Sequence, residues 1–157
     1  MKVGIGQDSH RFSDDTTKPC VIGGIVIEGV PGMDADSDGD IVLHALCNAI
    51  TSITHVPILG GIAIDMCKKE GITDSKEYLK KALETLVGFT IEHIAFSVEA
   101  KKPKLQPHTD AIRKSVADLC GISVDNVGFT STSGDGMTPF AQGIGTQCFC
   151  MLTVNKS

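Results

Sequence analysis

The spacing of apolar residues along the chain predicts five strands and three helices. Apolar residues that alternate with polar ones or form short runs predict strands at 2–8, 21–27, 94–98, 127–132 and 146–154. Apolar residues that recur every three or four positions predict helices around 41–50, 78–86 and 112–120. Because the order is strand, strand, helix, helix, strand, helix, strand, strand, we expect an α+β sandwich in which helices cover one face of a sheet. No linker or repeat interrupts this order, so residues 1–157 are expected to form a single domain.

Polar residues mark the ends of the predicted helices. Ser37 is expected to cap the first helix, with Asp40 completing a capping box three residues later. Asp74 and Glu77 form the same signature before the second helix. Gly88 is expected to end the second helix, because glycine readily adopts the left-handed conformation that follows a helix, and the third helix is expected to run up to Gly121.

Composition and charge narrow the functional classes. The chain carries a formal net charge of −5, so it lacks the basic field that draws a protein onto a nucleic-acid backbone. No apolar run approaches the roughly 20 residues that a membrane span needs, and the N-terminus shows no signal-peptide anatomy. The six cysteines are scattered and include no CxxC pair, which favours reduced core thiols over a disulfide framework. We therefore expect a cytoplasmic protein that binds neither nucleic acid nor membrane.

Two short segments together offer a set of metal ligands. Asp8 and His10 are two residues apart in a predicted strand, so their side chains project from the same face. His44 lies about two turns into the first predicted helix, on the same face as Asp40, which would fix the tautomer of the imidazole. One carboxylate and two imidazoles are suitable ligands for zinc. From spacing alone two other interpretations stay open: a His44 satisfied by Asp40 inside the fold, and an acidic cluster at 36–40 that only complements the helix dipole.

Two further segments have the composition of anion-binding loops. Residues 100–108 follow a predicted strand and hold three lysines and two prolines, so they could offer backbone groups and a lysine to a nucleotide phosphate. Residues 130–136 are rich in hydroxyl groups and glycine and could cradle a phosphate, while Asp135 could hold Mg²⁺. A solvated basic loop and an ordinary turn are the alternative interpretations of these two segments.

Four motifs occur in a characteristic order: G-x-D-x-H at 6–10, S-D-G-D-x-x-x-H-A at 37–45, P-K-x-x-P-H at 103–108 and T-S-T-S-G-D at 130–135. Together they resemble the 2-C-methyl-D-erythritol 2,4-cyclodiphosphate synthase family of the non-mevalonate isoprenoid pathway, over essentially the whole chain. The resemblance implies a lyase that converts 4-CDP-2-C-methyl-D-erythritol 2-phosphate to the cyclic diphosphate and releases CMP. It also implies a ferredoxin-like or chorismate-mutase-like sandwich with a mixed sheet. The sandwich would assemble as a homotrimer with active sites between subunits, and the strand at 148–154 would lie around the trimer axis.

The resemblance assigns roles to residues in and near these motifs. The implied ligands of Zn²⁺ are Asp8, His10 and His44. Asp135 is implied to hold the Mg²⁺ or Mn²⁺ that bridges the substrate diphosphate. The implied catalytic residues are Asp36, Ser133 and Asp135. The implied contacts to the substrate are Asp8, Ser9, His10, Asp36, Ser37, Ile58, Leu59, Gly60, Ala100, Pro103, Lys104, Leu105, Gln106, Thr132, Ser133, Gly134 and Asp135.

The chain departs from the family pattern at four positions. Asp36 stands where most members have a histidine that helps to stabilise the transferring phosphate, and Asn48 replaces a common aspartate. Ile58 takes the place of an aspartate that meets the methylerythritol, and Gln142 that of an arginine facing the trimer cavity. The alternative function is therefore a trimeric metal- and nucleotide-binding homologue without cyclase activity. A generic zinc hydrolase is a third hypothesis, for which the sequence offers no clear general base.

Overall fold

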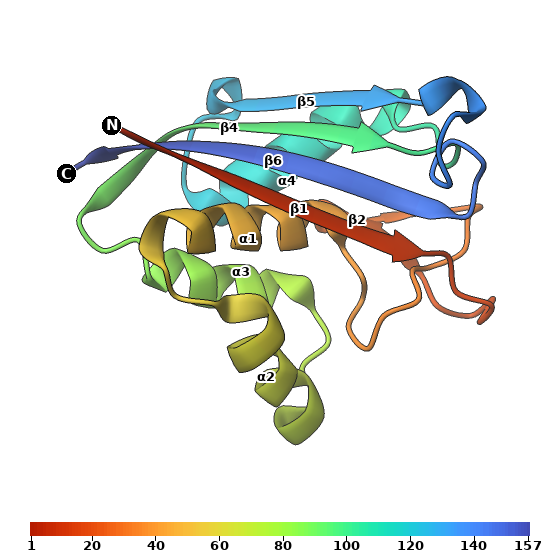
Figure 1. Cartoon of the computed structure of the whole chain (residues 1–157), viewed down its shortest axis with the longest axis horizontal. Coiled ribbons are helices and arrows are strands. Elements are labelled where there is room, and N and C mark those ends of the chain that lie inside the picture. Colours follow the sequence, from red (N-terminus) through yellow and green to blue (C-terminus); the bar gives the residue numbers. More distant parts are fainter.

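The sheet forms one layer of the computed structural model, which describes all residues from 1 to 157 (Figure 1). Its four strands lie in the order β1 (Lys2–Arg11), β6 (Gly145–Lys156), β4 (Phe89–Glu99) and β5 (Val127–Thr132). β6 pairs antiparallel with both β1 and β4, whereas β4 and β5 run parallel. The predicted mixed sheet is confirmed, and β1 and β5 are its two edges.

Helices cover one face of this sheet. α1 (Ile41–Thr54) lies along β1 and β6, and α4 (Thr109–Cys120) lies along β5. α3 (Ser75–Glu84) packs on the side of α1 that faces away from the sheet, and α2 (Ala63–Glu70) projects farther out (Figure 1). The predicted α+β sandwich with helices on one face is therefore confirmed.

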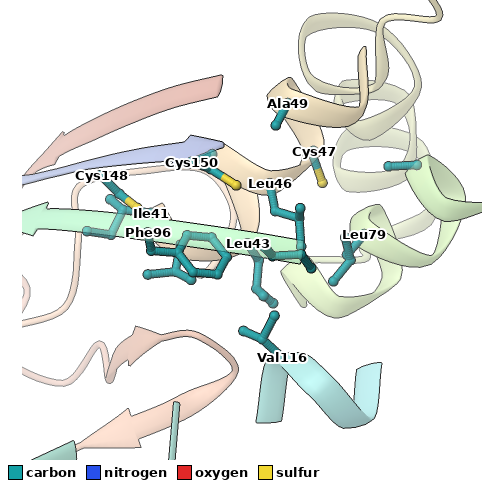
Figure 2. Packing of buried hydrophobic residues seen from close by; sticks show 14 of the residues in the cluster. Ile41, Leu43, Leu46, Cys47, Ala49, Leu79, Phe96, Val116, Cys148 and Cys150 are labelled. Atoms are coloured by element: carbon teal, nitrogen blue, oxygen red, sulfur yellow. The ribbon is translucent and has the colours of Figure 1, made fainter. Parts of the chain in front are cut away.

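The core lies on both sides of α1. Ten of the 14 residues of this helix are buried, because one side packs on the sheet and the other packs on α3. Figure 2 shows Leu43 and Leu46 of α1 among side chains from the sheet and from two other helices, including Phe96 of β4, Leu79 of α3 and Val116 of α4. A helix that is apolar nearly all round is expected at such a position, and its burial fixes the height of α1 over the sheet.

Side chains of β6 alternate between this core and an uncovered face. Cys148 and Cys150 pack inside the chain and are fully buried. Phe149 and Met151 project from the other face, where 42% and 53% of their surface is exposed. The strand at 148–154 was expected to surround a trimer axis, but only this second set of residues is free to contact another chain. The physical reason is the two-residue period of a strand, which sends neighbouring side chains to opposite faces.

The segment predicted as one strand at 21–27 is a hairpin. β2 (Cys20–Ile22) and β3 (Ile25–Ile27) pair antiparallel across Gly23 and Gly24. Both glycines have positive φ, 64° and 78°, which is the backbone conformation of a two-residue type I′ turn. The prediction of a continuous strand was wrong. Apolar residues flank the two glycines on both sides, so the apolar pattern gives no sign that the chain reverses direction between them.

The residue that caps α1 also differs from the prediction. Asp40, not Ser37, is the N-cap, and its carboxylate accepts two backbone N–H groups of the first helical turn. The same carboxylate accepts the N–H groups of both glycines in the β2–β3 turn, so it ties that hairpin to α1. The local sequence pattern allows either Ser37 or Asp40 to cap α1. Asp40 is the cap because its carboxylate also binds the hairpin. The cap predicted at Asp74 is confirmed, and α4 ends before Gly121 as predicted. The end predicted at Gly88 was wrong, because α3 already ends at Glu84 with Thr85 as its C-cap.

α2 is a helix that the apolar spacing did not predict. It follows a tight turn (Ile58–Ile62) whose backbone is not helical at Leu59 and Gly60, where Gly60 has a φ of 87°. Only Ala63 and Met66 of α2 are buried, so its apolar face is too small for the 3.6-residue period to show. No single helix is long and apolar enough to cross a membrane; α1 and the segment 58–70 meet that test only as a pair, across a bend of 96°.

Candidate metal centre and nucleotide pocket

The three predicted metal ligands converge near the end of β1. Asp8 and His10 extend from one face of the strand, and His44 reaches them from α1. Asp8 Oδ2 lies 2.9 Å from His10 Nε2 and 3.2 Å from His44 Nδ1. The two ring nitrogens are 3.4 Å apart. The prediction that these side chains form one group is therefore confirmed.

Two glycines in β1 allow α1 to come this close. A Cβ at Gly4 would stand 2.3 Å from the carbonyl oxygen of Ala49, and a Cβ at Gly6 would stand 2.0 Å from that of Ala45. Any side chain at either position would therefore push α1 away from the strand. Because His44 is adjacent to Ala45, this backbone contact sets the distance between His44 and the two ligands on β1.

The donor set and its geometry fit Zn²⁺. A tetrahedral zinc ion with bonds of about 2.0–2.1 Å sets its ligand atoms about 3.3–3.4 Å apart, close to the separations in this group. Asp8 Oδ2 is buried, and no group other than the two imidazoles lies within hydrogen-bond distance of it, which is expected of an oxygen that shares a cation with those rings. Three protein ligands also leave the fourth tetrahedral position for an oxygen atom of a substrate. The structure thus supports the predicted zinc site.

Electrostatics within the group favour an ionised Asp8. Burial by itself would raise the pKa of the Asp8 carboxyl, but its contacts with His10 and His44 outweigh burial and lower that pKa. Burial by itself would lower the pKa of His44, but the Asp8 carboxylate outweighs burial and raises it. The carboxylate is therefore in the state that binds a cation, and protons compete with a metal for His44.

The imidazole of His44 is held by Ser75 rather than by Asp40. Nε2 of His44 lies 2.7 Å from Oγ of Ser75, the first residue of α3. The prediction that Asp40 fixes the tautomer is wrong, because its carboxylate is occupied as the cap of α1 and by the hairpin. Sequence reasoning missed Ser75 because it lies 31 positions from His44, and no local spacing links the two.

A cavity of about 310 Å³ opens beside these ligands, and we call it the metal cavity. Four predicted substrate contacts join the ligands in its lining: Asp36, Ser37, Leu59 and Gly60. α2 supplies a wall that the sequence did not indicate, made of Ala63, Ile64, Cys67 and Lys68. Tyr78 of α3 closes another side. The four wall residues on α2 were missed because the apolar spacing did not predict that helix.

Two predicted contacts lie away from the metal cavity. Ser9 alternates with Asp8 and His10 along β1, so its side chain projects from the opposite face and is exposed. Ile58 is buried in the core, with 1% of its surface exposed. Their contacts with a substrate stay a prediction.

The predicted nucleotide segment and phosphate loop meet in a second cavity of about 190 Å³, which we call the nucleotide cavity. Its lining contains seven predicted residues: Ala100, Pro103, Lys104, Leu105, Gln106, Thr132 and Ser133. Lys101 and Ser131, which lie within the two predicted segments, also line it. The backbone N–H of Ala100 donates to the carbonyl oxygen of Thr132 at 3.0 Å. This hydrogen bond fastens the two segments to each other.

Asp135 follows the nucleotide cavity on an exposed left-handed turn. Its φ is 52°, and the flanking Gly134 and Gly136 have φ values of 72° and 75°. Aspartate is among the residues that tolerate this conformation, and two neighbouring glycines make it accessible. Neither Gly134 nor Asp135 lines the cavity, so their contacts with a cation and a substrate stay predictions.

The two cavities belong to opposite edges of the sheet. His10 lies on β1 and Thr132 ends β5, and the two strands β6 and β4 lie between them. With about 4.8 Å between neighbouring strands, the two edge strands are about 14 Å apart. The cavities share no lining residue. One chain thus carries two separate cavities.

A model of the YgbB family matches residues 1–155. The chain belongs to the YgbB family. A relative from Chlamydia muridarum, named 2-C-methyl-D-erythritol 2,4-cyclodiphosphate synthase, is 52% identical over 155 residues, which cover 98% of this chain and 87% of the relative. A relative of the same name from Chlamydia trachomatis serovar L2b is 50% identical over the same shares of the two chains. The family predicted from the four motifs is confirmed.

A solved structure shows the same fold. It is described as 2C-methyl-D-erythritol-2,4-cyclodiphosphate synthase, is 26% identical, and aligns with 98% of this YgbB-family chain and 100% of its own chain at a TM-score of 0.83. The two chains therefore share their whole architecture, and no part of the solved chain lacks a counterpart here.

Proposed function

We propose that this YgbB-family protein is a metal-dependent cyclodiphosphate synthase, a phosphorus-oxygen lyase of isoprenoid precursor synthesis. It converts 4-CDP-2-C-methyl-D-erythritol 2-phosphate to 2-C-methyl-D-erythritol 2,4-cyclodiphosphate and CMP. The observation that carries the proposal is the open ligand group of Asp8, His10 and His44, in a chain that is 52% identical to a protein of that name over nearly its whole length.

The reaction requires mainly positioning and charge compensation from the protein. The 2-phosphate of the substrate is already ionised at neutral pH and attacks the β-phosphorus, and CMP leaves, so no side chain has to remove a proton. Zn²⁺ bound at the ligand group, with Mg²⁺ or Mn²⁺ at Asp135, would orient the diphosphate and withdraw negative charge from it. The Ser133 hydroxyl, at the nucleotide cavity, is placed to donate a hydrogen bond to a phosphate oxygen.

We assign Asp36 a role in the phosphate transfer because it lines the metal cavity. A carboxylate there repels a phosphate unless a cation lies close to both. Lys68 of α2 lines the same cavity and carries a positive charge. We therefore assign the pair Asp36 and Lys68, in place of the usual histidine, to the surroundings of the transferring phosphate.

We assign the cytidine portion of the substrate to the nucleotide cavity. All residues of the segment 100–106 except Lys102 line it, and backbone and side-chain groups of such a segment can hydrogen-bond to the edge of a cytosine ring. Lys104, Thr132 and Ser133 offer one positive charge and two hydroxyl groups to the phosphates. A solved structure of the same enzyme name in a form bound to CDP aligns with this chain at a TM-score of 0.80 and 25% identity, which supports a cytidine nucleotide as the ligand.

We further propose that the active protein is a homotrimer. A CDP substrate has to reach both cavities, yet they lie at opposite edges of the sheet, so each active site would combine the metal cavity of one chain with the nucleotide cavity of the next. Such a head-to-tail contact between identical chains closes into a three-membered ring when it rotates each chain by a third of a turn. The uncovered face of the sheet supports this assembly, because it exposes apolar side chains at Val3, Ile5, Phe149 and Met151.

We also propose that residues 1–157 act as one domain in the cytoplasm. A single cluster of 33 buried hydrophobic residues joins all the layers of the fold. All six cysteines are free, which suits a reducing compartment.

The experiment that tests the proposed activity is phosphorus NMR of the purified protein with the CDP substrate, Zn²⁺ and Mg²⁺. We expect signals of CMP and the cyclic diphosphate to replace those of the substrate with the wild type, and no conversion with His44→Ala. His55→Asn, which changes an exposed histidine at the end of α1, is the matched control and should keep the activity. Intact substrate with a wild-type protein that binds zinc and CDP would contradict the cyclase and favour the binding homologue.

A further inference from the structure

Ser75 is one of the few polar side chains that are completely buried. Its hydroxyl oxygen lies 2.7 Å from Nε2 of His44 and also forms a hydrogen bond with Oδ1 of Asp38. Its backbone N–H donates to the other carboxylate oxygen of Asp38 at 3.0 Å. Ser75 therefore connects the Asp38 carboxylate to the side of the His44 ring that faces away from the metal ligands.

The direction of these hydrogen bonds follows from the chemistry of the carboxylate. An ionised Asp38 can only accept, so the Ser75 hydroxyl donates its single proton to it. The Ser75 oxygen can then only accept from His44, which places the proton of the neutral imidazole on Nε2. Nδ1 keeps its lone pair, and Nδ1 is the atom that lies 3.2 Å from Asp8 Oδ2. The chain of hydrogen bonds thus selects the tautomer that can ligate a metal through Nδ1.

Asp38 is itself fixed from two sides. The backbone N–H of Asp40 donates to Oδ1 of Asp38 at 3.1 Å, and the backbone N–H of Asp38 donates to the carbonyl oxygen of Thr73 at 2.9 Å. The segment before α1 and the segment before α3 are therefore joined at Asp38. His44 lies between two rigid supports, β1 with the other ligands on one side and the start of α3 on the other.

We propose that Ser75, held by Asp38, is a positioning residue of the metal centre. It fixes the orientation and the tautomer of His44, and the negative charge of Asp38 at the end of the hydrogen-bond chain makes Nδ1 a stronger donor to a cation. This inference rests on the zinc site of the proposed function. It adds that metal affinity depends on where α3 begins, although no residue of α3 ligates the metal.

The tautomer can be measured in the zinc-loaded wild-type protein. Nitrogen-15 NMR of the histidine side chains distinguishes a ring with its proton on Nε2 and the metal on Nδ1 from the reverse arrangement. We expect His44 to carry its proton on Nε2. A His44 ring protonated on Nδ1 would overturn the inference. This measurement needs no variant, so it stands even if a substitution at Ser75 prevents folding.

The affinity for zinc provides the second test, by chelator competition on metal-free protein. We expect Ser75→Ala to bind zinc about 10- to 100-fold more weakly than the wild type, as is typical when a hydrogen-bond partner of a ligating histidine is removed. The matched control is Lys80→Ala, which changes an exposed residue of the same helix away from His44 and should bind zinc like the wild type. Unchanged affinity in a folded Ser75→Ala protein would refute the positioning role and leave the zinc site standing. A wild type that binds no zinc would overturn the proposed metal centre as well.

Discussion

The backbone of Gly6 in β1 runs against the carbonyl oxygen of Ala45 in α1 so closely that a Cβ on Gly6 would stand 2.0 Å from that oxygen. The contact joins the strand that carries Asp8 and His10 to the helix that carries His44. Because Gly6 has no Cβ, α1 can pack closely on β1, and the same close packing sets the geometry of the metal centre.

This contact predicts a large effect of the smallest possible substitution at Gly6. We expect Gly6→Ala to lower the free energy of unfolding by roughly 3 kcal/mol, because the added methyl group meets backbone that has nowhere to move. Any folded protein should also bind zinc more weakly than the wild type. Denaturant unfolding and chelator competition measure the two effects. Gly61→Ala is the control, since a Cβ there meets open space, and its unfolding free energy should change by less than about 1 kcal/mol.

Removal of the metal is expected to destabilise the protein. A ligand that binds only the folded state adds about 4 kcal/mol to stability when its free concentration is a thousand times its dissociation constant. Thermal unfolding of the zinc-loaded wild type should therefore shift to lower temperature when a chelator is added. His10→Ala should unfold at the same temperature with and without chelator. An identical melting temperature for the wild type in both conditions would argue that no metal is bound at this group.

The separation of the two cavities predicts that inactive chains can rescue each other. His44→Ala damages the metal cavity and Lys104→Ala damages the nucleotide cavity, so each variant alone should be inactive. In every trimer that contains both variants, about a third of the sites would combine an intact metal cavity with an intact nucleotide cavity. Activity of the purified mixed trimers should therefore reach about a third of the wild-type value, measured as CMP release. Mixed trimers that stay inactive would show that each site is built within one chain.

Burial of the core cysteines predicts that one thiol reacts first. Burial, with a smaller contribution from Asp40, raises the pKa of Cys20 to about 12, and burial raises the pKa of Cys120 to about 12. At pH 8 such a thiol is ionised in only about one molecule in 10⁴, and the thiolate is the reactive form. Cys67 is half-buried and lines the metal cavity, so we expect it to react first with a thiol reagent.

Mass spectrometry after brief labelling of the native protein locates the reactive thiol. Cys67→Ser should abolish the fast phase, and all six cysteines should react after unfolding in denaturant. Bound substrate should slow the reaction of Cys67, because the thiol would then lie against an occupied cavity. Fast labelling of Cys20 or Cys120 in the native wild type would contradict the burial on which the prediction rests.

The sequence by itself determined the features that depend on neighbouring residues. Asp8 and His10 share a face because alternation is a property of any strand, whatever the strand pairs with. The apolar spacing predicted α1, α3 and α4, since each buries a continuous stripe of side chains. The cap at Asp74 and the end of α4 before Gly121 were also predicted, because the partners are N–H or carbonyl groups within the same turn.

Only the tertiary structure decided the features that depend on contacts between distant segments. Asp40 rather than Ser37 caps α1 because the hairpin at Gly23 and Gly24 adds two further donors to its carboxylate. Ser75 holds His44 because α3 packs on the side of α1 opposite β1, 31 residues farther along the chain. Local patterns cannot rank such partners, since the same side chain satisfies several short-range roles equally well. Which partner a side chain takes follows from the segments that the folded core brings into contact. Here the packing of α1 between β1 and α3 decides the partner of His44.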